Sequence, residues 1–132
     1  MNLIRIFGGP PYLLLGWIDL LNGDIESVIE NATLALEVAP KNNTVLPVAA
    51  SLLRRVGKYE AAQPAFSKTL RTNPNPMQWV WFEYAGTLIA LKDFVKAKEL
   101  LRTALTRKEI GTQNTIVLMH LAAIAVFEND ME

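Results

Sequence analysis

The sequence predicts an all-α protein, a solenoid of about seven helices arranged as stacked antiparallel hairpins. Gly23 and Gly57 stand 34 residues apart, and the residues that follow each of them are similar. Helix-breaking residues also recur along the chain, and the segments between them show the periodicity of amphipathic helices. Self-similarity at such a period is typical of helical repeat proteins, in which each hairpin buries its apolar face against its neighbours.

Breakers bound each of the predicted helices. Glycine and asparagine let a helix end through a left-handed residue, and proline cannot continue a helix. In chain order the breakers are Pro10-Pro11, Asn22-Gly23, residues 40–43, Gly57, residues 73–76, Lys92-Asp93, Gly111 and residues 128–130. The helices expected between them cover residues 11–22, 25–38, 44–56, 60–72, 77–91, 94–108 and 114–128.

The apolar pattern is clearest in the third and fourth predicted helices, where apolar residues recur with helical spacing on one face. These residues are Leu46, Ala49, Ala50 and Leu53 in the third helix, then Ala62, Ala65, Phe66 and Leu70 in the fourth. Alanine at such positions lets two helices approach closely. Pro47 and Pro64 lie in the same helices, and we place each in an opening turn, where the missing N–H would have no helical partner.

Composition excludes several classes of function. Of the 132 residues, 51% are hydrophobic and 20% are charged, which suits one folded domain and does not suit a disordered chain. The absence of cysteine excludes disulfides, zinc–thiolate sites and thiol nucleophiles. It also suits a reducing compartment, and we expect a cytoplasmic protein.

The net charge is zero, but the charges are unevenly distributed. Residues 1–40 carry a net charge of −4, residues 41–108 carry +8, and residues 109–132 carry −4. A basic middle between acidic ends would attract an acidic partner. The alternative is an ordinary solvated surface of mixed charge.

No segment of the sequence is predicted to enter a membrane. The longest charge-free apolar run, from Thr115 to Phe127, is shorter than the roughly 20 residues that a membrane helix requires. Gly8-Gly9 and the two prolines after them interrupt the apolar N-terminal stretch, and no small-residue cleavage pattern follows. We therefore expect no signal peptide either.

The repeated residues resemble the tetratricopeptide repeat (TPR), a 34-residue unit with small and large apolar residues at set positions of two antiparallel helices. Matching residues include Tyr12, Gly16, Ala32 and Pro40, then Leu46, Ala49, Phe66 and Pro74, then Trp81, Tyr84, Ala97 and Ala104, and finally Leu118, Leu121 and Ala125. The resemblance implies a right-handed superhelical solenoid. It covers residues 9–132, after an N-terminal extension of residues 1–8, with repeats at 9–42, 43–76 and 78–111 and a partial repeat at 115–132.

The third and fourth repeats depart from the family pattern. The third has Lys92 where glycine is usual, and it lacks the closing proline. The partial fourth repeat ends in an apolar helix that contains Leu118, Leu121, Ile124 and Phe127 and has no following partner helix. We expect that the chain belongs to a longer protein or that it associates with a second copy through this helix.

In TPR proteins the first helix of each repeat lines a concave groove that binds extended or helical peptides. The resemblance predicts an apolar, arginine-marked groove whose peptide-binding residues are Leu13, Trp17, Leu20, Ser51, Arg54, Arg55, Trp79, Phe82 and Met119. Family members that hold the C-terminal carboxylate of chaperones use a lysine–asparagine clamp. The matching places here hold Leu13, Trp17, Val48, Trp79 and Glu83, which argues against a chaperone-tail adaptor.

Two interpretations of the groove aromatics remain open. In the first, Trp17, Trp79 and Phe82 anchor a hydrophobic peptide, while Arg54 and Arg55 reach an acidic group. In the second, these aromatic side chains pack between neighbouring helices or are covered by the apolar N-terminal residues.

The sequence contains no catalytic or metal-binding motif. His120 is the only histidine, and HExxH, GxSxG and a glycine-rich phosphate loop are all missing. We expect no enzyme activity, no cofactor and no metal. The basic residues of the sixth predicted helix alternate with Asp93 and Glu99 and lack an aromatic stacking platform, so we expect no nucleic-acid binding.

The leading functional hypothesis is a non-enzymatic scaffold that binds a peptide or a protein segment. The alternative is a regulatory or oligomerisation region of a larger bacterial signalling protein. That alternative rests on the segments around Gly16-Trp17 and residues 73–79, which are similar to repeats that follow nucleotidyl-cyclase or winged-helix regulator domains.

Overall fold

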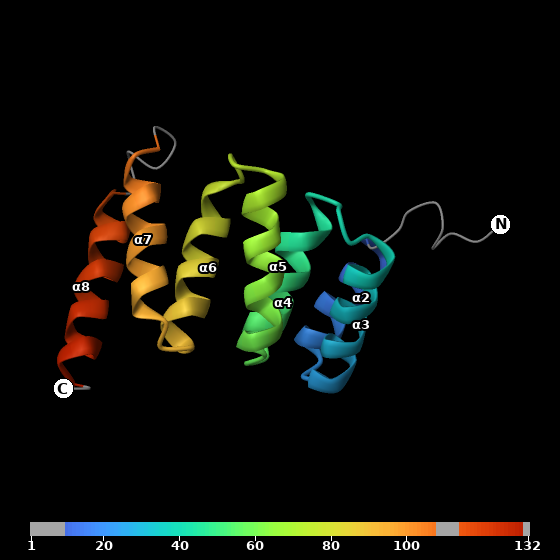
Figure 1. Cartoon of the computed structure of the whole chain (residues 1–132). Coiled ribbons are helices and arrows are strands. Elements are labelled where there is room, and N and C mark those ends of the chain that lie inside the picture. The colour runs from blue at the N-terminus through green and yellow to red at the C-terminus, as the bar shows by residue number, and fades with distance from the viewer. Residues whose placement is uncertain (1–9, 108–113, 131–132) are drawn as a thin grey trace. The chain divides into compact units, whose positions relative to one another are not determined.

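The computed structural model describes residues 10–107 and 114–130, and within these ranges it contains seven helices and no strand (Figure 1). The helices are α2 (Pro10–Leu21), α3 (Ile25–Val38), α4 (Val45–Arg55), α5 (Tyr59–Thr72), α6 (Gln78–Ala90), α7 (Phe94–Leu105) and α8 (Asn114–Asp130). Each begins and ends within three residues of its predicted range. The prediction of an all-α fold of about seven helices is confirmed.

The chain divides into two compact units, residues 1–75 and residues 76–132. In the first unit each helix from α2 to α5 packs against the next, and α2 also contacts α4. In the second unit α6 packs against α7, and α7 packs against α8. Figure 1 shows these neighbours running antiparallel within each unit, as predicted for helical hairpins.

Helix α4 lies at the centre of the first unit. Eight of its eleven residues are buried, because α2, α3 and α5 all contact it. Ala49 and Ala50 of α4 and Ala62 of α5 are completely buried, which lets these helices approach closely. Among the residues that the structure describes, Phe66 is the largest completely buried side chain.

In the second unit, α6 supplies the large buried side chains and its neighbours supply mostly smaller ones. Trp81 and Tyr84 of α6 are buried, while Ala97 and Ala104 of α7 face the core. Helix α8 completely buries Val117 and Ile124, which are two helical turns apart. Only a narrow stripe of α8 is therefore buried in this unit.

The prediction for Pro64 is wrong, whereas that for Pro47 is confirmed. Pro47 is the third residue of α4, but Pro64 is the sixth residue of α5 and lies inside the helix. Proline at this place removes the N–H that would bond the carbonyl of Glu60. Because Glu60 is exposed, water can hydrogen-bond that carbonyl, and α5 continues to Thr72.

Three turns between paired helices share one hydrogen-bonding pattern. After α2, the N–H of Asp24 donates to the carbonyl of Asp19 at 2.9 Å, across a left-handed Gly23. The same bond joins Lys58 to Leu53 at 2.8 Å and Asp93 to Leu88 at 2.9 Å. This pattern defines the Schellman motif, which satisfies carbonyl groups at a helix end.

The third of these turns uses a lysine where the other two use glycine. Lys92 has a φ of 61°, close to the 76° of Gly23 and the 82° of Gly57. A left-handed backbone costs a residue with a Cβ about 1–2 kcal/mol. The sequence departure at Lys92 therefore leaves the turn geometry unchanged and stores backbone strain in it.

We expect Lys92→Gly to raise the free energy of unfolding by about 1 kcal/mol, because glycine adopts this φ without steric cost. Lys92→Gln removes the charge but keeps the Cβ, and it should leave stability nearly unchanged. Urea unfolding followed by circular dichroism measures both variants. Equal stabilisation by the two variants would show that the lysine charge, rather than the backbone, is responsible.

Candidate functional site

In the first unit, α2 and α4 bring together three of the predicted groove residues. The guanidinium carbon of Arg55 lies 5.2 Å from the centre of the Trp17 ring, a cation–π contact. The Nε of Arg55 also donates to Oγ of Ser51 at 3.3 Å. Ser51 and Arg55 are four residues apart on α4, so they share one face of the helix. We call Trp17 and Arg55 the tryptophan–arginine pair.

The close approach of α2 to α4 depends on Gly16. A Cβ added at Gly16 would lie 3.0 Å from Cδ1 of Leu52, which is a completely buried residue of α4. Real Cβ contacts at this distance require the neighbour to move. The absence of a side chain at Gly16 therefore lets the next residue, Trp17, reach Arg55.

The other predicted residues of this unit differ in their exposure. Leu13 is only 6% exposed and Ser51 is also buried, so both mainly support the surface from beneath. Leu20, Trp17 and Arg54 are half-buried, and Arg55 is exposed. The surface that α2 and α4 present thus combines a partly exposed indole ring with an exposed positive charge.

In the second unit, the predicted groove residues lie on α6 and α8. The Phe82 ring stacks on the His120 ring, with centres 6.0 Å apart and planes at 23°. Phe82 and Trp79 are half-buried, whereas Met119 is 65% exposed. Part of the Phe82 ring is therefore covered by a neighbouring helix. This is the packing between helices that the second interpretation of the aromatic residues describes.

Three further contacts in this unit were not predicted from the sequence. Arg107 places its guanidinium 5.3 Å from the centre of the buried Trp81 ring, and Phe94 stacks on Phe127 with centres 6.4 Å apart. Lys98 and Glu128 also form an ion pair of 2.7 Å between α7 and α8. The spacing of these residues along the chain gives no signal for the three contacts, because each contact joins residues from separate segments of the chain.

Helix α8 also carries an exposed apolar face. Leu118, Met119 and Val126 are all more than half exposed, and Ala122 is exposed between them. Their spacing at i, i+4 and i+8, with Met119 beside the first of them, places them along one side of the helix. We call these four residues the α8 face.

The described part of the chain offers no site for a metal ion. No three histidine, cysteine, aspartate or glutamate side chains lie close enough there to hold one. None of the described helices is both long and apolar enough to cross a membrane.

Comparison with known proteins agrees with this arrangement of helices. The family model for the tetratricopeptide repeat matches residues 53–108, which run from the end of α4 to just beyond α7. The first TPR of Spaghetti (RPAP3), bound to the HSP90 peptide SRMEEVD, superposes with a TM-score of 0.65 at 17% identity, covering 86% of this chain and 93% of that chain. Residues 53–108 therefore match the tetratricopeptide repeat, and the described helices have a TPR-like fold.

A second TPR structure supports the same conclusion about the fold. The first TPR domain of human RPAP3, determined by NMR, has a TM-score of 0.64 at 16% identity and covers 89% of this chain and 94% of that one. No curated protein matches the chain in sequence. The predicted fold class, an all-α solenoid of TPR hairpins, is confirmed by these likenesses.

The repeats predicted from the sequence suggest a place for the tryptophan–arginine pair. In that division α2 and α4 are the first helices of the first two repeats, and α3 and α5 are the second helices. Trp17 and Arg55 would then lie on the helices that the resemblance to TPR proteins assigns to the groove.

Proposed function

We propose that this TPR chain is a non-enzymatic scaffold that binds a peptide or protein segment along the first helices of its repeats. The observation that carries the proposal is the tryptophan–arginine pair, in which α2 and α4 hold an indole ring beside a positive charge. Tryptophan and arginine are the residues most often found at binding hot spots. The RPAP3 domain bound to an HSP90 peptide supports the general role, since it has the same fold.

The chemistry of the pair suggests what the ligand contains. The indole ring would contact an aliphatic or aromatic side chain of the ligand, and the guanidinium would bond a carboxylate. Ser51 and the ring of Trp17 restrain the Arg55 side chain, so binding would cost less side-chain entropy. Arg54 and Leu20 remain predicted contacts in the first unit. Trp79, Phe82 and Met119 remain predicted contacts of the second unit, considered by itself.

The HSP90 peptide itself is not the ligand that we expect. The places that would form a lysine–asparagine clamp hold Leu13, Trp17, Val48, Trp79 and Glu83. The aliphatic side chains and the carboxylate at these places cannot donate to the terminal carboxylate of a peptide, and each tryptophan offers one neutral N–H in place of a lysine charge. The peptide SRMEEVD therefore serves as a comparison ligand, expected to bind more weakly than peptides selected for this chain.

The proposal is tested with peptides selected from a random library against the whole chain and measured by fluorescence anisotropy. Arg55→Glu should weaken their binding about tenfold or more, because it puts a negative charge beside the ligand carboxylate. Arg71→Glu makes the same charge change at an exposed place on α5 and should alter binding by less than about twofold. Equal losses in both variants, or failure to select any peptide, would contradict the proposal.

A second candidate function is self-association through the α8 face. The observation in its favour is the side-by-side exposure of Leu118, Met119, Ala122 and Val126. We expect light scattering to detect a dimer at high protein concentration, and Val126→Asp to dissociate it. Val95→Asp is the matched control, since Val95 is a similarly exposed valine on α7. A strictly monomeric chain at every concentration would exclude this candidate.

A further inference from the structure

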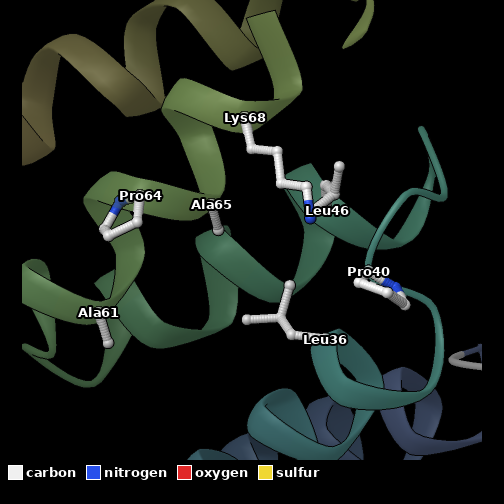
Figure 2. Close-up of a pocket in the computed structure, with 7 residues that line it drawn as sticks. All are labelled: Leu36, Pro40, Leu46, Ala61, Pro64, Ala65 and Lys68. Atoms are coloured by element: carbon white, nitrogen blue, oxygen red, sulfur yellow. The ribbon is translucent and has the colours of Figure 1, made fainter. Parts of the chain in front are cut away.

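The first unit contains an apolar pocket that is separate from the tryptophan–arginine pair. It has a volume of about 190 Å³ and is lined by Leu36 of α3, Leu46 of α4, and Ala61, Pro64, Ala65 and Lys68 of α5 (Figure 2). Pro40, in the loop between α3 and α4, also lines it. Six of the seven lining residues are apolar, and Lys68 alone carries a charge. We call it the Lys68 pocket.

The pocket lies between the second helices of two repeats. Its α5 residues come from positions 61, 64, 65 and 68, which share one side of a helix. Ala61 and Ala65 are too short to reach Leu36 across the gap, so the space between α3 and α5 stays open. Pro40 and Pro64 contribute ring side chains to the lining, and these cannot swing away from the pocket by rotation about a free side-chain bond.

This apolar lining is specific to the second repeat. Counting from the left-handed turn residue, the same positions hold Ser27, Glu30, Asn31 and Leu34 on α3, and Lys96, Glu99, Leu100 and Thr103 on α7. Both of those helices therefore present a mostly polar surface where α5 presents alanine and proline. The general TPR pattern does not require the apolar residues of α5 at these positions.

The size and the charge of the pocket define its occupant. A volume of about 190 Å³ is below the usual 300–1,000 Å³ of a small-molecule site but suits one aliphatic side chain. Figure 2 shows the Lys68 side chain extending along one side of the pocket toward Leu46. Lys68 is half-buried, and none of the carboxylates in the described ranges forms an ion pair with it.

We propose that the Lys68 pocket binds a partner polypeptide through a leucine-sized aliphatic side chain that is followed directly by an acidic residue. The aliphatic side chain enters between Leu36 and Ala65, and the neighbouring carboxylate accepts a hydrogen bond from the Lys68 ammonium. The carboxylate supplies the charge that Lys68 lacks within the fold. The site is distinct from the surface of the tryptophan–arginine pair and allows one chain to hold two partners.

The test is an NMR titration of the isotope-labelled whole chain with a blocked hexapeptide that contains a central leucine–glutamate pair. Binding through a single anchor is weak, so peptide concentrations up to about 10 mM are used. We expect shifts in the amide signals of Leu36, Ala61 and Ala65. Peptides in which alanine replaces the leucine, or glutamine replaces the glutamate, should produce shifts about fivefold smaller at equal concentration.

Four variants separate this pocket from other sites. Lys68→Glu should weaken binding about fivefold or more, and Ala61→Phe should do so by filling the pocket from an exposed position. Arg71→Glu changes the same charge one turn further along α5, and Arg55→Glu alters the proposed peptide groove. Both should leave the affinity within about twofold of the original.

Three results would overturn the proposal. The first is no amide shift at the pocket at the highest peptide concentration. The second is an equal loss in Lys68→Glu and Arg71→Glu, which would indicate unspecific charge attraction. The third is a set of shifts confined to Trp17, Ser51 and Arg55, which would support the groove function and reject the Lys68 pocket. Binding at Lys68 that persists in Arg55→Glu supports the pocket whether or not the groove binds peptides.

Discussion

Replacement of Phe66 by alanine is expected to lower the free energy of unfolding by about 3–5 kcal/mol. Phe66 is 0% exposed and is the largest completely buried side chain of the described residues. Truncation removes its apolar surface from the core and leaves a cavity that the surrounding helices can only partly close. A domain of this size has a total stability of about 5–15 kcal/mol, so the variant loses a large part of it.

The matched control for this prediction is Phe127→Ala. Phe127 is 47% exposed and contacts the Phe94 ring, so its truncation should cost about 1 kcal/mol. Chemical unfolding followed by circular dichroism gives both values under the same conditions. Similar losses for the two phenylalanines would contradict the assignment of Phe66 to the centre of the core.

The second large effect is expected for Gly16→Leu, which should lower the free energy of unfolding by about 2–3 kcal/mol. The new side chain would begin at a Cβ only 3.0 Å from Cδ1 of Leu52, so α2 and α4 would have to separate. Separation of these helices would also move the Trp17 ring away from Arg55. We therefore expect the variant to lose peptide binding as well as stability.

A double-mutant cycle shows whether the Leu52 contact is responsible. Gly16→Ala alone combines a gain in helix propensity of about 1 kcal/mol with crowding against Leu52. In a Leu52→Ala background the crowding is absent, so the same change should stabilise the chain by about 1 kcal/mol. An identical effect of Gly16→Ala in both backgrounds would exclude a direct contact between the two positions.

Much of the fold could be predicted because its signals are local. The breakers and the apolar spacing place every described helix, and the Gly23 and Gly57 repeat gives the hairpin pairing. Lys92 shows that the left-handed turn is kept even where lysine replaces the usual glycine. The position of Pro64 could not be predicted correctly, because the apolar spacing does not fix the first residue of a helix. Helix α5 begins at Tyr59, so Pro64 lies inside it.

The candidate site could be predicted only in part. The family pattern identifies the side of α2 and α4 that carries Trp17 and Arg55, but not the depth of each residue. Leu13 lies on the predicted side and is nevertheless buried, because α2 approaches α4 closely at Gly16. The pairing of Phe82 with His120 depends on two helices that are far apart in sequence, and the sequence carries no signal for it.

The Lys68 pocket is a further feature that sequence patterns do not reveal. Three helices and a loop must be placed together before Leu36, Pro40 and Ala65 are seen to line one pocket. The residues responsible are individually ordinary. Alanine and proline at positions 61, 64 and 65 become informative only when the corresponding polar residues of α3 and α7 are compared with them.

Helices α2 and α4 are proposed to present a peptide-binding surface built on the tryptophan–arginine pair. The most direct measurement is an NMR titration of the labelled chain with a peptide selected for binding, in which the indole N–H signal of Trp17 and the Nε–H signal of Arg55 are followed. We predict that both signals shift with one shared affinity, and that Arg55→Glu raises the peptide concentration needed to shift the Trp17 signal about tenfold or more. Tight binding that leaves both signals unchanged would contradict the claim.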